Sequence, residues 1–295
     1  MVMSESNLQA VIDKAVDSCL EKFADRKLQA SELAVCLVDM QDSESLGFAG
    51  YRQEVEIFPA SLVKLFYAVA VCHWLGQGKL VKTAELDRSM RDMLADSSND
   101  ATAYIVDLLT GTTSGPELDE AEFCQWSAKR NCINEFFRSF GYQDINVNQK
   151  TWGDGPYGRE RDFLGAAFEN RNKLTARSTA RLLVDIALGK AALPQYCQEL
   201  LKYMERDRSK PSTGVDDQAH GFIGAILPPG ARFWSKSGWT STVRHDAIFF
   251  HLDDRSRYCL VVFTENHAQQ RDILSSVGLE IISSLVAAAG PCCHG

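Results

Sequence analysis

The sequence predicts an α/β (α+β) fold, in which an antiparallel sheet flanked by helices carries an inserted all-helical domain. Segments rich in β-branched and apolar residues occur at 33–58 and again from about 221 onward, whereas residues 61 to about 109 show apolar spacing of three and four. We therefore expect a discontinuous sheet domain of residues 1–60 plus 212–295 and a helical domain of residues 61–211. A cleft between them is the expected place for an active site.

Before residue 61 we expect one helix and two strands. Within residues 1–23, Val11, Ala15 and Leu20 recur at helical spacing. The segment LAVCLVDM (33–40) reads as a strand, and SLGFAGYRQEVEIF (45–58) as its hairpin partner with a glycine turn near 47–50.

The middle of the chain is predicted to be helical, with one long loop. Residues 110–173 have weaker periodicity, with a helix in CINEFFRSFGY (132–142) and a loop rich in glycine and charge, TWGDGPYGRERD (151–162). A further helix follows in LTARSTARLLVDIALGK (174–190), opened by a capping threonine.

The last part of the chain predicts strands followed by a helix. The strand segments are FIGAILPPG (222–230), ARFWSKSG (231–238), RHDAIFFHL (244–252) and RYCLVVFTE (257–265), and the helix is QQRDILSSVGLEIISSLVAAAG (269–290). In the tail, Cys292, Cys293 and His294 are too few to indicate a metal site, and a frayed terminus is the favoured interpretation.

Composition narrows the class of partner. The 295 residues carry a net charge of -8 without a basic run, which argues against nucleic acid, and no apolar stretch is long enough for a membrane span. The N-terminus lacks the basic and apolar regions of a secretory signal, so we expect a cytoplasmic protein; a periplasmic or secreted one would need a leader removed from this sequence. The nine cysteines, an odd number, are expected to be mostly buried thiols, and no cofactor or metal is expected.

Ser61 and Lys64, three residues apart at the start of a predicted helix, are the sharpest candidates for catalysis. One helical turn places both side chains on the same face. A hydroxyl needs a nearby base to act as a nucleophile, and a partly dehydrated lysine can supply one. Alone, the motif is weak, because a capping serine beside an exposed lysine is common.

Two further motifs carry chemistry. Ser97-Ser98-Asn99 lies at a predicted junction between helices, where a hydroxyl can relay a proton and an amide can hold a carbonyl group; a plain helix N-cap is the alternative. Lys236-Ser237-Gly238 lies on a predicted strand, where small residues admit a substrate backbone and the lysine adds positive potential. A lysine protecting an edge strand is the alternative there.

Together, in this order, the three motifs resemble the S-x-x-K, S-D-N and K-T-G signature of class A β-lactamases and penicillin-binding proteins. The likeness covers roughly residues 33–286 and includes LADSSNDATAYIVDLLTG and KSGWTSTVRHDAIFFHLDDRSRYCLVVFTE. It implies a β-lactamase/transpeptidase-like fold. Ser98 and Ser237 replace the usual Asp and Thr of the signature.

The resemblance also implies roles for individual residues. Ser61 would be acylated with help from Lys64, Ser97 would pass a proton to the leaving group, and Lys236 would support it electrostatically. The backbone N–H groups of Ser61 and Trp239 would form the oxyanion hole. The implied substrate-binding residues are Asn99, Ser237, Gly238, Trp239 and Arg244, the last with an ion pair to Asp246 as an equal alternative.

One departure concerns deacylation. The family's Glu shortly after a Trp activates the water that clears the acyl-enzyme, and here Gly153 and Asp154 follow Trp152. Asp154 or Glu160 could reach the water from a differently shaped loop, although an ordinary loop charge is the favoured interpretation of both. Efficient penicillin hydrolysis is therefore doubtful.

The sequence thus predicts a serine hydrolase that acts through an acyl-enzyme on an amide, ester or β-lactam bond of a small molecule, with a cytosolic substrate that is not an antibiotic. A true class A β-lactamase and a non-catalytic binding protein on the same fold are the alternatives. A glutaminase-like amidase fits the Lys-Ser-Gly strand less well.

Overall fold

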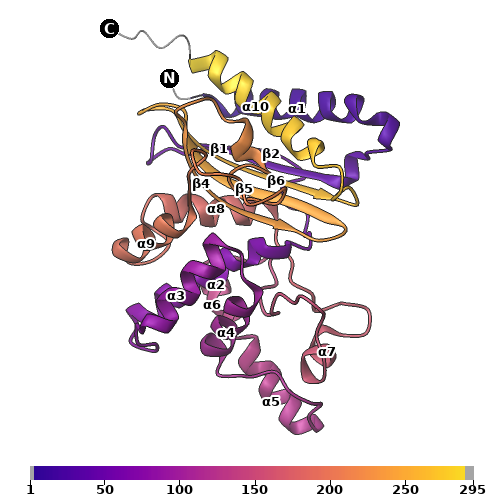
Figure 1. The fold of residues 1–295 in the computed structure, drawn as a ribbon, viewed down its shortest axis with the longest axis vertical. Coiled ribbons are helices and arrows are strands. Elements are labelled where there is room, and N and C mark those ends of the chain that lie inside the picture. Colours follow the sequence, from indigo (N-terminus) through magenta and orange to yellow (C-terminus); the bar gives the residue numbers. More distant parts are fainter. Residues whose placement is uncertain (1–2, 290–295) are drawn as a thin grey trace.

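The computed structural model describes residues 3–289, which fold around one six-stranded antiparallel sheet with helices on both faces (Figure 1). The strand order is β2-β1-β6-β5-β4-β3. The strands are β1 (Leu33–Asp39), β2 (Gly47–Tyr51), β3 (Glu205–Arg206), β4 (Arg232–Trp239), β5 (Val243–His251) and β6 (Arg257–Glu265). The predicted fold class, an antiparallel sheet flanked by helices with a helical layer, is confirmed.

Ten α-helices are described in residues 3–289. They are α1 (Glu5–Lys22), α2 (Val63–Gly76), α3 (Ala84–Ala95), α4 (Asn99–Thr110), α5 (Glu120–Arg130), α6 (Cys132–Ser139), α7 (Arg159–Leu164), α8 (Ala176–Ala187), α9 (Pro194–Met204) and α10 (Asp272–Ala289). Helices α1 and α10 cover one face of the sheet, and α8 lies against the other, with α2 to α7 beyond it (Figure 1).

The two faces of the sheet contribute to two separate cores because side chains alternate along each strand. In β1, Leu33, Val35 and Leu37 pack under α1 and α10, whereas Ala34 and Cys36 pack toward α2 and α8. Helix α8 contacts β1, β5 and β6 directly, so it joins the sheet to the helical layer.

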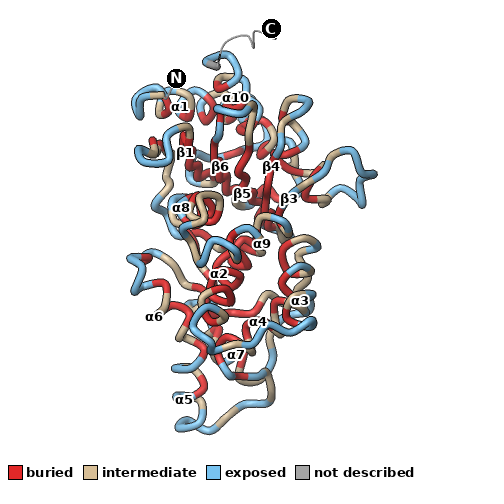
Figure 2. The backbone as a smooth tube through the Cα atoms, turned by 90° about the vertical axis from the view of Figure 1, so that its left-hand side faces the viewer, coloured by how far each residue is buried: buried red, intermediate tan, exposed pale blue. Residues whose placement is uncertain are grey.

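Helix α2 is buried on nearly all sides, as its continuous burial in Figure 2 shows. A helix that is apolar all round belongs in a core. The charged group of Lys64 is the exception, since the residue is fully buried near the start of this helix. The fold therefore places an amine in a largely dehydrated environment.

Two local predictions were wrong. Residues 47–50 belong to β2, and the connection from β1 turns earlier, near 42–45. The segment 222–230 is not a strand: it contains a 3-10 helix, Ile223–Ile226, whose Gly224 lies against the Phe233 ring. Its two prolines lack the N–H groups that a strand ladder requires.

Two further features concern the length of the apolar helices and the state of the cysteines. Among residues 3–289, no helix is both long and apolar enough to cross a membrane. Seven cysteines in this range are free thiols, five of them buried. The tail residues Cys292, Cys293 and His294 lie outside the described residues.

Candidate active site

Ser61 lies in a tight turn that leads into α2. Residues Ala60–Leu62 form a 3-10 helix, and Ala60 has a positive φ of 47°. Gly238 on β4 packs against this turn, so closely that a Cβ there would lie 2.8 Å from the Pro59 carbonyl oxygen and 2.9 Å from the Ser61 nitrogen. The third sequence motif therefore touches the backbone of the first.

His245 fixes the same turn from β5. Its Nε2 donates a hydrogen bond to the Phe58 carbonyl oxygen (2.9 Å), and its Nδ1 accepts one from the Thr264 backbone N–H (3.1 Å). An imidazole that donates at one nitrogen and accepts at the other is neutral. Burial lowers the pKa of His245 to about 4, so the imidazole remains neutral near neutral pH.

Lys64 and Lys236 meet at Ser97. Lys64 Nζ donates to Ser97 Oγ (3.2 Å), the Ser97 carbonyl oxygen (2.5 Å) and Asn99 Oδ1 (2.9 Å). Lys236 Nζ approaches Ser97 Oγ to 3.0 Å and also donates to the Ser237 carbonyl oxygen and to Gln218 Oε1. The amines of Lys64 on α2 and Lys236 on β4 thus converge on the Ser97 hydroxyl, at the junction between α3 and α4.

Burial lowers the pKa of both lysines. Dehydration lowers the pKa of Lys64 to about 7. Dehydration and then the charge of Lys64 hold the pKa of Lys236 well below its usual value. A buried amine with a pKa near neutrality can take up and release a proton at physiological pH.

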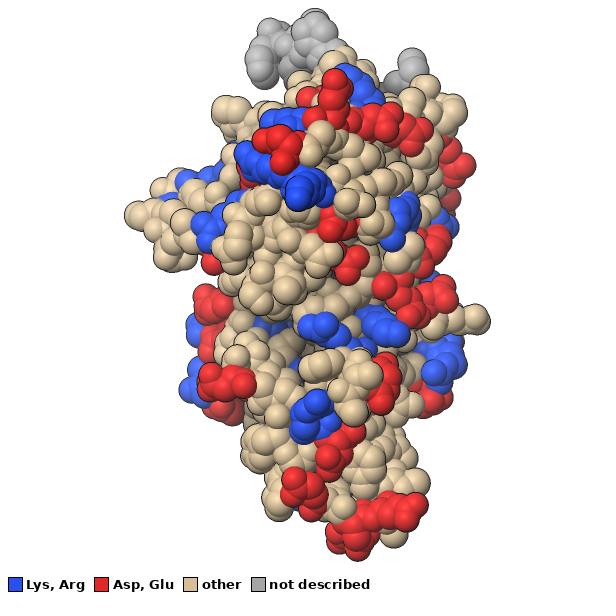
Figure 3. Space-filling view, turned by 90° about the vertical axis from the view of Figure 1, so that its right-hand side faces the viewer, with Lys and Arg blue, Asp and Glu red and all other residues tan. Residues whose placement is uncertain are grey.

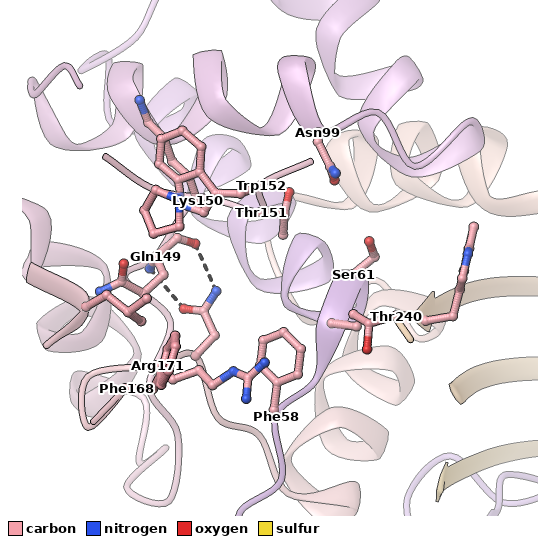
Figure 4. A pocket seen from close by; sticks show the side chains of 15 residues that line it. Phe58, Ser61, Asn99, Gln149, Lys150, Thr151, Trp152, Phe168, Arg171 and Thr240 are labelled. Atoms are coloured by element: carbon pink, nitrogen blue, oxygen red, sulfur yellow. Dashed lines mark hydrogen bonds between the residues drawn. The ribbon is translucent and has the colours of Figure 1, made fainter. Parts of the chain in front are cut away.

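A pocket of about 270 Å³ opens beside Ser61 (Figure 4). The Ser61 hydroxyl points into it, toward Asn99. Among residues 3–289 no Asp or Glu lines this pocket. Its walls are made by Phe58, Ala60, Ser61, Asn99, Gln149, Lys150, Thr151, Trp152, Pro156, Leu164, Phe168, Arg171, Asn172, Trp239 and Thr240.

The predicted substrate-binding residues divide into two groups. Asn99 and Trp239 line the pocket, and Gly238 lies directly behind Ser61. Ser237 and Arg244 do not line it. The pocket is therefore lined by Asn99 from the second motif and by Trp239 at the end of β4.

Ser237 and Arg244 lie outside the pocket lining, and their contact with substrate stays a prediction. The Ser237 hydroxyl is buried and donates to Asp246 Oδ1 (2.8 Å). Arg244 is also buried: it pairs with Asp216 (2.8 Å) and stacks on the Phe222 ring. The alternative pairing of Arg244 with Asp246 is wrong, because the ion-pair partner of Arg244 is Asp216.

Neither predicted deacylation base lines the pocket. Asp154 is exposed on the loop after Trp152. Glu160, at the start of α7, is fully buried, and its Oε1 accepts hydrogen bonds from Arg130 Nη2 (2.7 Å) and the Ser114 hydroxyl (2.8 Å). The charge of Glu160 is therefore committed to holding the long loop against α5.

Sequence reasoning missed the far wall of the pocket. The Asn172 side chain holds residue 149 in place, since its Oδ1 accepts from the Gln149 N–H and its Nδ2 donates to the Gln149 carbonyl oxygen, both at 2.9 Å (Figure 4). The Gln149 side-chain amide is buried, and neither of its polar atoms has a hydrogen-bond partner among the described residues. An orphaned amide in a pocket wall is a candidate contact for substrate or water.

Arg206 and Gln218 were also missed. Arg206, on β3, donates to the Ser235 and Leu94 carbonyl oxygens and so ties β4 to the end of α3, next to Ser97. Gln218 bridges the Ala95 carbonyl oxygen and Lys236 Nζ. No periodicity in the sequence marks either residue.

The sheet with its helical layer, and a Ser-x-x-Lys turn facing a second serine and a strand lysine, define the class of β-lactamase-like serine proteins. Residues 15–285 match the beta-lactamase enzyme family (Beta-lactamase2), and the chain belongs to this family. The recognition of this family from the sequence is confirmed.

Solved structures show the same fold at low sequence identity. A β-lactamase from Sphaerobacter thermophilus is 18% identical, with a TM-score of 0.67, over 94% of this chain and 98% of that one. A class A β-lactamase representative from Bacteroides cellulosilyticus is 16% identical (TM-score 0.65; 95% and 99% covered). A PBP-A variant in an acyl-enzyme complex with penicillin G is also 16% identical (TM-score 0.64; 93% and 97% covered). No curated protein sequence matches the chain.

Proposed function

We propose that this protein is a serine hydrolase that forms an acyl-enzyme at Ser61 from a small amide, ester or β-lactam. The observation that carries the proposal is the convergence of Lys64 and Lys236 on Ser97 Oγ, together with the hydrogen bond from Lys64 to Asn99, which lines the Ser61 pocket. A purely binding protein has no need of two buried lysines on one hydroxyl, because burying cations without a carboxylate partner costs free energy.

Lys64 is the proposed base for acylation. With a pKa near 7, about half of it is neutral at neutral pH, and the neutral amine can accept the Ser61 proton as the Oγ–carbonyl bond forms. The proton then passes through Ser97, to which Lys64 is already hydrogen-bonded, onto the departing nitrogen or oxygen. Lys236 keeps Ser97 oriented for this transfer by donating to its oxygen.

The backbone N–H groups of Ser61 and Trp239 are the proposed oxyanion hole. Gly238 brings the end of β4 against the Ser61 nitrogen, which supports placing the two N–H groups on one carbonyl oxygen. Donors fixed in advance at such a position are usually the largest single contribution to acyl transfer.

Deacylation of β-lactam adducts is proposed to be slow. No carboxylate from residues 3–289 lines the pocket to activate a water molecule, and the Gln149 amide in its wall is neutral. An amide is a poor proton acceptor, so a bulky acyl group on Ser61 should persist. The penicillin G acyl-enzyme of the PBP-A variant is the kind of adduct that we propose here.

Intact-mass spectrometry tests this proposal. The protein is incubated with nitrocefin, a fluorescent penicillin and a panel of activated esters, and the modified peptide is mapped. We expect one adduct, on the peptide that contains Ser61, and its loss in Ser61→Ala. Ser98→Ala is a matched control, because Ser98 caps α4 through the Ala101 N–H and lies outside the pocket lining.

The outcome also separates the alternatives. Fast turnover without an accumulating adduct would favour a true class A β-lactamase. Reversible binding without any adduct across all reagents would favour a non-catalytic binding protein and would contradict the proposal.

A further inference from the structure

The strongest unassigned feature of the pocket is the side chain of Arg171. Two cations line this pocket, and Lys150 is neutralised by Asp107 at 2.7 Å. Arg171 has no carboxylate within ion-pair distance among residues 3–289, and its side-chain N–H groups donate no hydrogen bond there. Glu169, two residues away, accepts from the Ala167 N–H instead.

The guanidinium of Arg171 is held flat on an aromatic ring. Its Cζ lies 3.5 Å from the centroid of the Phe58 ring, three residues before Ser61. Stacking fixes the plane of the guanidinium and leaves its N–H edges available for a planar anion such as a carboxylate. Burial also lowers the pKa of Arg171, so an anion beside it would relieve an uncompensated charge.

The position of Arg171 identifies which part of a substrate it would meet. Ser97, the proposed donor to the leaving group, does not line the pocket, whereas Phe58, Phe168 and Arg171 do. A substrate acylating Ser61 therefore places its leaving group toward Ser97 and its acyl group in this pocket. At about 270 Å³, the pocket suits a short acyl chain.

Resting on the proposed function, we infer that the preferred substrates are short acyl donors with a terminal anion, such as the monoamide or monoester of a dicarboxylic acid, recognised by Arg171. The charge distribution supports this inference. Although the chain has a net charge of -8, Lys and Arg side chains gather around a hollow at the waist of the face in Figure 3. An anion approaching this face meets a favourable potential.

Matched esters test the inference. The p-nitrophenyl ester of valeric acid and the mono-p-nitrophenyl ester of glutaric acid differ only in a terminal methyl or carboxylate group, and 4-(valeryloxy)benzoate moves the carboxylate to the leaving group. We expect wild type to prefer the glutarate ester. Arg171→Gln should lower kcat/KM for that ester by about 10- to 100-fold and change the valerate ester by less than about threefold.

Two variants control for structural effects. Arg171→Lys should retain part of the preference for the glutarate ester, because it keeps the positive charge but loses the planar guanidinium that can donate two parallel hydrogen bonds to a carboxylate. Arg177→Gln should leave the preference unchanged, since Arg177 also stacks on a phenylalanine, Phe48, but lies outside the pocket lining. An equal loss on both acyl esters in Arg171→Gln, or a wild type without preference for glutarate, would overturn the inference.

A binding measurement tests the preference for an anion independently of the proposed acylation. Acylation by the valerate ester alone would support the proposed function and refute the anion preference. If no ester acylates Ser61, the proposed function fails, and calorimetry with glutaramate, a monoamide that Ser61→Ala cannot cleave, still decides the inference. We expect binding that weakens at least about tenfold when Arg171→Gln is added, and equal binding would refute the inference.

Discussion

Lys64 on α2 and Lys236 on β4 donate to the same oxygen atom, Ser97 Oγ, from opposite sides of the interface between the helical layer and the sheet. Because both amines are buried, neither can hold a full charge easily while the other is charged. The protonation of the two amines, and with it the reactivity of Ser61, should therefore depend on pH near neutrality.

We therefore expect the acylation rate of Ser61 to rise with pH and to level off above about pH 7, where Lys64 loses its proton. The direction follows from the role of the neutral amine as base: below its pKa, the rate should fall about tenfold per pH unit. Stopped-flow acylation by an activated ester between about pH 5 and pH 9 measures the profile.

Lys64→Arg should abolish this pH dependence together with the activity, because arginine does not deprotonate. Lys82→Arg is the matched control, since Lys82 is an exposed lysine paired with Glu199. A wild-type profile that is flat across neutrality would contradict the role of Lys64.

Gln149→Glu should convert a persistent β-lactam adduct into one that turns over. The substitution keeps the shape of the side chain and places a carboxylate in the pocket wall, where the Gln149 amide lacks hydrogen-bond partners. General-base assistance should shorten the adduct lifetime by about tenfold or more. Gln149→Leu serves as the control and should not shorten it; equal lifetimes in all three proteins would exclude residue 149 as a position for a base.

Glu160→Gln should destabilise the protein, because the buried Arg130 guanidinium loses its closer carboxylate partner at 2.7 Å and keeps only Asp107 at 3.6 Å. Breaking a buried pair in this way costs about 3–5 kcal/mol. Urea denaturation measures the free energy of unfolding. The exposed pair Glu135–Arg138 provides the comparison, and Glu135→Gln should cost at most about 1 kcal/mol. Equal costs for the two substitutions would argue against a structural role for Glu160.

Gly238→Ala should slow acylation by about 100-fold, because the new Cβ would displace the Ser61 turn and small misplacements of a nucleophile are costly. The contacts at 2.8 and 2.9 Å are to backbone atoms, which cannot rotate away. Gly153→Ala, with no heavy atom within 4 Å of its Cβ, is the control. Acylation followed by mass spectrometry, with a melting curve for each variant, separates the loss of activity from unfolding.

The candidate motifs could be found in the sequence because each one is local. Ser61 and Lys64 are a turn apart, and Ser97 lies at a junction between helices that periodicity reveals. Their convergence, however, was inferred from the order of the motifs and from the family resemblance. Nothing local in the sequence states that Lys64 and Lys236 reach the same hydroxyl.

The errors arose where strand register or long-range contacts decide a side chain's partner. Ser237 is paired with Asp246 in the β4–β5 register, so their side chains share a face and bond to each other, which the sequence pattern alone did not indicate. Arg244 meets Asp216 on a loop without periodic signal. Likewise, the pocket wall at Gln149 depends on Asn172, which is distant in sequence.

The imidazole of His245 should make the folded protein less stable at acid pH. Its folded-state pKa of about 4 lies below the ordinary value of 6.5, so the unfolded chain binds a proton at higher pH than the folded one does. Acidification through this interval consequently favours unfolding, and near its lower end the ring would lose the lone pair that receives the Thr264 N–H. The link from β5 and β6 through His245 to the turn before Ser61 would then weaken, so acid should release the segment around Phe58.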